Sequence, residues 1–394
     1  MSERSRVISA LGIVQIFNWG STYYLLAVLA GPIQRGTGWS AEAVTAGISI
    51  GLLISGLVAR RVGRLIQTHG GRLVLAGGVG CIAAGLVMLG LAQTFGLYLA
   101  AWIVIGLGMG AGLYDAAFST LGRLYGHEAR RAITVLTLWG GFASTVCWPI
   151  SAFLVDALGW RGACFAYTGL HLGVTLPLCL FALPRKVPPL PSSPGRSRPD
   201  GDTLIHDPRL WLIAVAGVTL AVLAALWSIH VMTILKADGY GLAAAVGLGV
   251  FIGPSQVAAR VIEMLSGGRH HPAWTMMAAT GLVAAGFAGL LVGAPAAAAL
   301  VAYGAGNGLW SIARGALPLA IFDPQDYALV MGRLARPTLI ASAAAPLVGS
   351  ALLDHLGPYG TLDTLAVVSV LPLAAAILLV LIIRREAGAQ LKAF

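Results

Sequence analysis

Charged side chains stand at three unusual places in this sequence. Asp115 follows the apolar and glycine-rich run "GLGMGAGLY", and Arg314 lies within a similar run, "GAGNGLWSIARGALPL". Arg260 comes near the end of a third apolar run, four residues after Gln256. An ionised side chain inside an apolar segment is expensive, so each of these residues needs a polar partner, an aqueous cavity or an exit to the surface.

These residue types suggest definite chemistry. A carboxyl group such as Asp115 can take up and release a proton. The planar guanidinium groups of Arg314 and Arg260 can bind a carboxylate through two parallel hydrogen bonds. Two simpler interpretations stay open: Asp115 and Arg314 either reach the cytoplasmic surface or form a structural salt bridge, and Arg260, like Arg61, anchors a helix end.

Aromatic and polar side chains accompany these charges in three of the apolar runs. Such a mixture supplies the apolar walls and the few hydrogen-bonding groups that a small-molecule site needs. The same residues are also ordinary packing residues, and a lone histidine is more often a hydrogen-bonded interior residue than a functional one. The candidates are Asn18, Trp19, Tyr23, Tyr24, Trp227, His230, Asn307 and Trp310.

No arrangement typical of an enzyme is present. The sequence has no serine, histidine and acid at a credible spacing and no nucleotide-binding loop, because the glycine runs lie inside apolar segments. His270 and His271 are adjacent and would point apart on a helix, which makes a poor metal pair. The four cysteines lie in apolar segments without paired spacing. We expect no catalytic residues, no metal and no cofactor.

Composition indicates what surrounds these residues. Of 394 residues, 58% are hydrophobic and 10% are charged, which is more apolar surface than a soluble domain of this length can bury. Apolar stretches of about 20 residues, the length that crosses a bilayer as a helix, recur along the chain. We expect an all-α membrane protein with twelve transmembrane helices, near 8–31, 43–63, 73–92, 97–121, 132–154, 162–183, 209–235, 242–262, 273–292, 296–321, 329–353 and 361–383.

The basic residues predict the orientation. The net charge is +10, but the basic residues lie in short connections rather than in a separate domain, so we expect no nucleic-acid partner. With the N-terminus inside, the outer connections hold only Arg35, Arg161 and Lys236. This is the positive-inside pattern. It predicts a multi-pass protein of the inner (cytoplasmic) membrane with both termini in the cytoplasm. Separately, we expect the protein to be monomeric.

The chain divides into two similar halves. A proline-, serine- and charge-rich stretch, 184–208, reads as a cytoplasmic linker between six-helix bundles at 1–183 and 209–394. The strings "DALGWRG" from Asp156 and "DHLGPYG" from Asp354 match at a separation of 198 residues. The glycine runs match at 196 residues when Gly108 is aligned with Gly304, which aligns Asp115 with Ser311. We expect two pseudo-symmetric bundles that arose by duplication.

Over its full length, the chain resembles members of the major facilitator superfamily. "GRLIQTHGGR" from Gly63 to Arg72 is similar to the signature loop between spans two and three, with Gln67 in place of the usual aspartate and Gly71 in place of a basic residue. Gln256 and Arg260 resemble the acid-x-x-x-arginine element of the monocarboxylate porters, with Gln256 in place of the acid; the nearest branch is therefore the monocarboxylate and oxalate-formate porters. The residues that we assign to the signature loop and gate are Arg61, Gly63, Gln67, Gly70 and Arg72.

The resemblance implies a secondary transporter that works by alternating access, with spans one, four, seven and ten lining a cavity. Our first hypothesis is a carrier for a small organic anion, a carboxylate, coupled to protons through Asp115. Arg314, Arg260 and Gln256, with the aromatic and polar set above, would bind the substrate. A second hypothesis is an efflux carrier for amphiphilic or cationic compounds, in which the arginines are gates. A third is a membrane sensor that transports nothing.

Overall fold

The computed structural model describes residues 2–185, 206–267 and 269–392, and every regular element in these ranges is helical. The predicted linker, 184–208, lies mostly outside them. The helices are α1 Glu3–Gly20, α2 Leu25–Thr37, α3 Ala41–His69, α4 Gly71–Gly90, α5 Phe95–Gly112, α6 Tyr114–Tyr125, η1 Gly126–Glu128, α7 Ala129–Gly141, α8 Ala143–Leu170, η2 His171–Thr175, η3 Leu178–Ala182, α9 Pro208–Ala237, α10 Leu242–Gly249, α11 Ile252–Leu265, α12 Pro272–Leu291, α13 Ala296–Ile321 and α14 Tyr327–Lys392.

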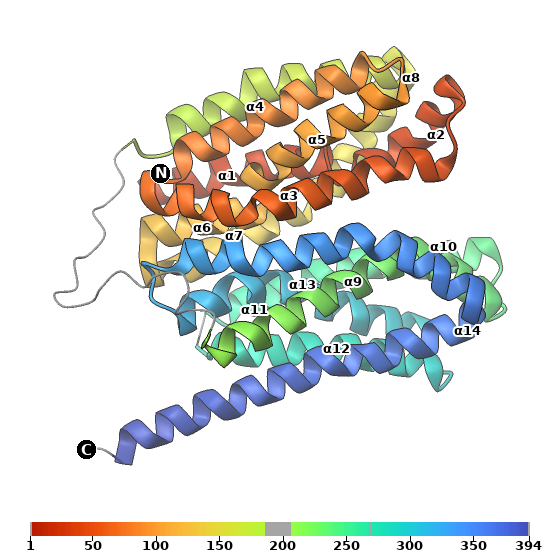
Figure 1. Ribbon diagram of the computed structural model, residues 1–394. Coiled ribbons are helices and arrows are strands. Elements are labelled where there is room, and N and C mark those ends of the chain that lie inside the picture. The colour runs from red at the N-terminus through yellow and green to blue at the C-terminus, as the bar shows by residue number, and fades with distance from the viewer. Residues whose placement is uncertain (1, 186–205, 268, 393–394) are drawn as a thin grey trace. The chain divides into compact units, whose positions relative to one another are not determined.

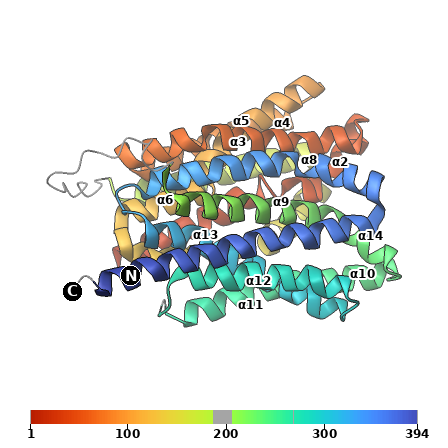
Figure 2. The same ribbon diagram turned by 60° about the horizontal axis from the view of Figure 1, so that its bottom comes forward.

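The protein is an all-α, multi-pass membrane protein. In the described ranges, nine helical stretches are long and apolar enough to cross a bilayer. Two of these stretches, Ala129–Ala182 and Tyr327–Glu386, each contain two of the predicted spans. Each stretch turns at a glycine with positive φ, Gly159 (φ 70°) and Gly357 (φ 67°). Figure 2 shows that α14 turns back on itself. The count of twelve stays a prediction.

The chain forms two compact units. Unit 1 is Met1–Ser192 with Phe322–Ala343, and unit 2 is Ser193–Ile321 with Ala344–Phe394. In Figure 1, α3, α4 and α5 run side by side within unit 1, and α12 runs along α13 within unit 2. Unit 1 thus includes Phe322–Ala343, which come from the second half of the sequence. The predicted bundles, 1–183 and 209–394, stay a prediction.

Glycines set the helix packing in both units, because they let backbones approach closely. A Cβ on Gly106 would collide with Gly51 of α3, and one on Gly108 would collide with Gly78 and Ile82 of α4. In unit 2, a Cβ on Gly304 would collide with Ile252 of α11. The next glycine of α13, Gly306, meets Ala279 and Val283 of α12 in the same way, and Gly308 meets Gln256 of α11.

These contacts correct the alignment of the two glycine runs. Gly304 packs against α11, in the second span of its half, as Gly106 packs against α3, in the second span of the other half. The alignment at 196 residues paired Gly304 with Gly108, which packs against α4, the third span. The separation is therefore 198 residues, which is also the separation of the turns at Gly159 and Gly357. Asp115 then aligns with Ala313 rather than with Ser311. The error arose because glycines alternate along both runs, so a shift of two residues still matches glycine with glycine.

Ion pairs connect the beginning of α9 to α14 in unit 2. Asp207 caps this helix, since its Oδ1 accepts a hydrogen bond from the Arg209 amide at 2.8 Å. The Arg209 guanidinium contacts both the Asp207 carboxylate, at 2.7 Å, and Glu386 of α14, at 3.0 Å. Burial acts to raise the pKa of the Asp207 carboxyl, but the hydrogen bonds and charge of Arg209 hold it below its ordinary value. The pair thus ties the start of α9 to the end of α14.

Two glycines of unit 2 give a matched test of this packing. A Cβ on Gly281 would lie 3.9 Å from Leu373, an ordinary contact, so Gly281→Ala should raise the free energy of unfolding by about 0.5–1 kcal/mol. A Cβ on Gly308 would lie 2.8 Å from the Gln256 Cα, so Gly308→Ala should lower it by about 1–3 kcal/mol. Thermal unfolding of the purified variants in detergent measures both. If both variants unfolded at a higher temperature than the parent, or both at a lower one, the close contact at Gly308 would not set the packing of α11 on α13.

Candidate functional site

Arg260 is held in a fixed orientation inside unit 2. Its side chain comes from α11 and is 7% exposed. Its Nε donates to Ser311 Oγ of α13 at 2.9 Å, and its terminal NH2 group donates to Gln256 Oε1 at 3.4 Å. Ser311 in turn donates to the Gly308 carbonyl at 2.6 Å, so its oxygen lone pairs face the guanidinium. The close approach at Gly308 brings α11 and α13 near enough for this contact.

The structure separates Arg260 from Arg61, the two arginines that were candidates for anchors of helix ends. Arg61 is exposed on α3, as an anchor at a helix end would be. Arg260 is buried and bonded to a neighbouring helix. The interpretation as a surface anchor therefore fits Arg61 and does not fit Arg260. Sequence periodicity does not distinguish the two, because both follow apolar runs.

Asp115 and Arg314 belong to different units. Asp115 lies in the first turn of α6 in unit 1 and is half-buried. A carboxylate at this place is favoured by the helix dipole, whose positive end lies at the N-terminus. Arg314 is half-buried on α13 in unit 2. Their expected pairing stays a prediction.

Three of the predicted aromatic residues gather in unit 1, where the first span is interrupted between α1 and α2. The Trp19 ring lies 5.4 Å from that of Tyr23 and 6.1 Å from that of Tyr24, between ring centroids. Two further rings, which we did not predict, complete the cluster: Tyr114 at 5.2 Å from Trp19 and Trp148 at 6.2 Å from Tyr24. The apolar spacing of α6 and α8 gave no sign of either contact.

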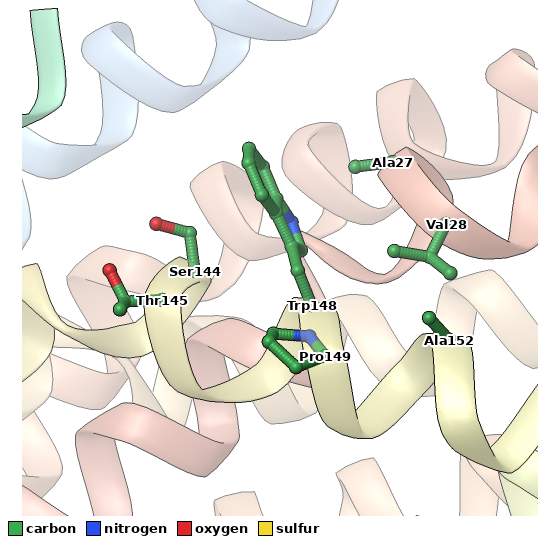
Figure 3. Close-up of a pocket in the computed structure, with 7 residues that line it drawn as sticks. All are labelled: Ala27, Val28, Ser144, Thr145, Trp148, Pro149 and Ala152. Carbon is green, nitrogen blue, oxygen red and sulfur yellow. The ribbon is translucent and has the colours of Figure 1, made fainter. Parts of the chain in front are cut away.

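Beside this cluster lies a groove between α2 and α8 (Figure 3). Its volume is about 470 Å³, within the range of small-molecule pockets. The Trp148 indole stands over the groove and is 45% exposed. Hydroxyl groups of Ser144 and Thr145 lie on one side of it. The groove is lined by Ala27, Val28, Ser144, Thr145, Trp148, Pro149 and Ala152.

Most of the residues of unit 2 that we predicted to line a substrate site are buried inside that unit. Trp227 is 1% exposed, and its ring lies 5.2 Å from Phe287 and 5.9 Å from Tyr303. His230 is buried, and a Cβ on Gly349 would collide with its ring. These contacts favour a packing role for both residues. Trp310 is also buried, whereas Asn307 is half-buried.

Asn18 is fully buried in unit 1. Its amide nitrogen donates to the Gly112 carbonyl at 2.9 Å, and the Gln15 amide donates to the same oxygen at 2.8 Å. A second buried network lies near the end of α1, where the His171 ring contacts Ser21 Oγ at 2.7 Å and Thr175 Oγ1 at 2.9 Å. Both ring nitrogens of His171 thus have hydrogen-bond partners inside the protein.

The signature loop fastens parts of unit 1 to one another. The Gln67 amide donates to the Gln325 carbonyl, and Arg123 Nε donates to the Gln67 carbonyl at 3.2 Å. Gly63 packs against the Ala328 backbone, where a Cβ would collide. The neutral Gln67 thus contacts the segment Phe322–Ala343 through a hydrogen bond, without the charge of the usual aspartate.

The same loop turns at Gly70, whose φ of 81° favours glycine. Arg72, just beyond, donates from its Nε to the Leu180 carbonyl at 2.8 Å. Among the residues that the structure describes, no three histidine, cysteine or acidic side chains are grouped as a metal site.

Three solved structures with the same fold are similar over nearly their full lengths. The human organic anion transporter TETRAN is 16% identical, with a TM-score of 0.73 over 95% of this chain and 100% of that one. A variant of the Escherichia coli fucose:proton symporter is 15% identical, with a TM-score of 0.71 over 94% and 98%. A proton:xylose symporter is 14% identical, with a TM-score of 0.70 over 95% and 94%. At these identities the likeness shows the fold alone.

Comparison with curated protein sequences finds no match. The model of the Major Facilitator Superfamily matches residues 11–311, which is more than half of the chain. This match and the fold agree with the resemblance of the signature loop, although neither distinguishes the monocarboxylate branch. The protein is a transporter rather than an enzyme, and the chain belongs to the Major Facilitator Superfamily.

Proposed function

We propose that this protein is a secondary active transporter that moves a small organic anion, a carboxylate, by alternating access. The observation that carries the proposal is the buried Arg260, held by Ser311 and Gln256. Burying a guanidinium in a membrane protein is costly. A guanidinium that is kept there despite this cost can bind a substrate of opposite charge.

The geometry around Arg260 suits a carboxylate. Ser311 and Gln256 hold the guanidinium plane in place before a substrate arrives, so less side-chain entropy is lost on binding. A planar carboxylate can accept two parallel hydrogen bonds from such a group. Arg314, on the same helix as Ser311, adds positive charge to unit 2. Together these residues favour an anion over a cation.

The similar structures are compatible with more than one substrate. TETRAN is an organic anion transporter, whereas the other two proteins carry sugars with protons. Unit 1 also offers the exposed Trp148 beside Tyr24, and aromatic faces attract organic cations. An efflux carrier for amphiphilic or cationic compounds is therefore the second candidate.

We propose Asp115 as the proton-coupling group. It is an acid within a span of unit 1, and it is half-buried at the start of α6. A carboxyl group is the side-chain type that can carry a proton in a transport cycle. The asymmetry of basic residues further supports an inner-membrane location with both termini in the cytoplasm. We expect the protein to act as a monomer.

Replacing Arg260 by lysine tests the substrate class. Lysine keeps the positive charge but loses the planar fork, so Arg260→Lys should weaken carboxylate binding by about thirtyfold or more, equivalent to about 2 kcal/mol or more. Binding can be measured by thermal stabilisation of the purified protein across a panel of carboxylates and amphiphilic cations. The exposed Arg61 provides the control: Arg61→Lys should bind as the parent does. Parental affinity in Arg260→Lys, or ligands that are all cations, would favour the efflux alternative.

A second variant tests the coupling. Asp115→Asn keeps the size of the side chain but cannot release a proton, so the protein should fold and bind its substrate while losing pH-driven accumulation. Uptake into proteoliposomes, with and without an imposed pH gradient, measures this. Exchange of labelled for unlabelled substrate without a gradient is the control and should persist. Undiminished proton-driven accumulation would mean that Asp115 is structural.

A further inference from the structure

Trp148 presents an exposed ring to the groove between α2 and α8 in unit 1. Its indole stands over the groove and is 45% exposed (Figure 3). Two other tryptophan rings of this protein each have a guanidinium group over them. Arg161 lies 4.1 Å from the centroid of Trp160, and Arg384 lies 5.0 Å from that of Trp274. No residue that the structure describes places a cation over Trp148 in this way. The electron-rich ring, which attracts cations, is therefore available to a ligand.

Prolines in both walls of the groove release backbone carbonyls. Pro149 lies inside α8, and Pro32 lies inside α2. Proline has no amide hydrogen, so the carbonyl four residues earlier loses its helical donor. These two carbonyls belong to Thr145 and Val28, and both residues line the groove. Within the described ranges, no side chain donates a hydrogen bond to either carbonyl. In a membrane such groups need another partner.

Two hydroxyl groups add to the acceptors of the groove. A serine or threonine inside a helix can donate to a carbonyl of the preceding turn, as Thr134 of α7 does to Arg130 at 3.1 Å. Ser144 is half-buried and Thr145 is exposed, and neither hydroxyl is bonded to a residue that the structure describes. Each hydroxyl has one hydrogen to donate and two lone pairs, and a carbonyl can only accept. Acceptors therefore outnumber donors in the groove.

We propose that this groove of unit 1 binds a small organic ammonium ion. The N–H groups of the ion donate to the carbonyls and hydroxyls of the groove, and its positive charge lies against the Trp148 ring. The apolar part of the ion packs on Ala27, Val28 and Ala152. The groove volume of about 470 Å³ is sufficient for a small amine.

The lining of the groove selects against other occupants. None of its lining residues is charged, so an anion finds no cationic partner there. A lipid chain has no N–H group to donate to the released carbonyls. The ammonium site is separate from the proposed carboxylate anchor, because all its residues belong to unit 1 and Arg260 belongs to unit 2. It goes beyond the proposed transport of a carboxylate and gives the second candidate, a carrier of cationic compounds, a defined binding site.

Two probes of similar size separate charge from shape: benzylammonium, and benzyl alcohol as its neutral counterpart. Their binding to the purified protein is followed by thermal stabilisation in a non-ionic detergent at neutral pH. We expect a saturable rise of the unfolding temperature with benzylammonium, and binding of benzyl alcohol that is weaker by about tenfold or more. Trp148→Leu should raise the half-saturating concentration of benzylammonium by about fivefold or more. Trp148→Phe should raise it less, because it keeps an aromatic ring.

A second pair of variants tests the released carbonyls. Pro149→Ala restores an amide hydrogen at that position, so the Thr145 carbonyl regains its helical partner. It should weaken benzylammonium binding by about threefold or more. Pro32→Ala does the same for the Val28 carbonyl and should act in the same direction. Alanine favours a helix, so both variants should fold.

Matched controls lie in unit 2. Trp274 is 42% exposed but already has Arg384 over its ring, and Pro318 lies inside α13. Trp274→Leu and Pro318→Ala should therefore bind benzylammonium as the parent does. Arg260→Lys should do so too, even where carboxylate binding is lost, so the two proposals can fail separately. The ammonium site would be overturned if the parent showed no saturable response to benzylammonium or bound benzyl alcohol equally well. Parental affinity in Trp148→Leu, or in both alanine variants of the groove, would overturn it as well.

Discussion

In the hydrocarbon core of a membrane, each backbone polar group has to find its partner inside the protein, and this constraint explains the places where the spans are irregular. The break at Leu113 would leave the Gly112 carbonyl unpaired, and the amides of Gln15 and Asn18 take over its hydrogen bonds. The first span is also interrupted, between α1 and α2. Ser21, at the end of α1, is hydrogen-bonded through its hydroxyl group to His171. At these two places in unit 1, fully buried polar side chains mark broken helices.

The membrane also explains why the helices pack closely at glycines. Helices surrounded by lipid gain little from the hydrophobic effect when they associate, so they depend on backbone approach and interhelical hydrogen bonds. In unit 2, the contact of Gly308 with Gln256 comes one turn before the hydrogen bond from Arg260 to Ser311. The glycine stripe is therefore part of what positions the arginine. A change at Gly308 would alter both the packing of α11 on α13 and the place of the charge.

The sequence was sufficient to predict an all-α membrane protein, because composition and the length of apolar stretches determine whether a chain spans a membrane as helices. It was also sufficient for the two turns at Gly159 and Gly357, whose surrounding strings match at one separation. It was not sufficient for side-chain direction. Trp227 was expected in a cavity wall and packs against Phe287, whereas Trp148, which was not among the candidates, is exposed over a groove. Which face of an apolar helix is turned inward depends on the helices packed against it. The residue pattern of the helix itself does not identify those neighbours.

Asn18 shows how this limit bears on function. From sequence it was grouped with Trp19 as part of a substrate site, since both lie in the first span. The two residues are adjacent on α1 and therefore point in different directions: Trp19 joins the aromatic cluster, and Asn18 turns to the Gly112 carbonyl. One helix thus contributes to two places in unit 1. Because Tyr114 packs against Trp19 and directly follows the break that Asn18 stabilises, the hydrogen bond of Asn18 bears on the position of the aromatic cluster through residues in direct contact.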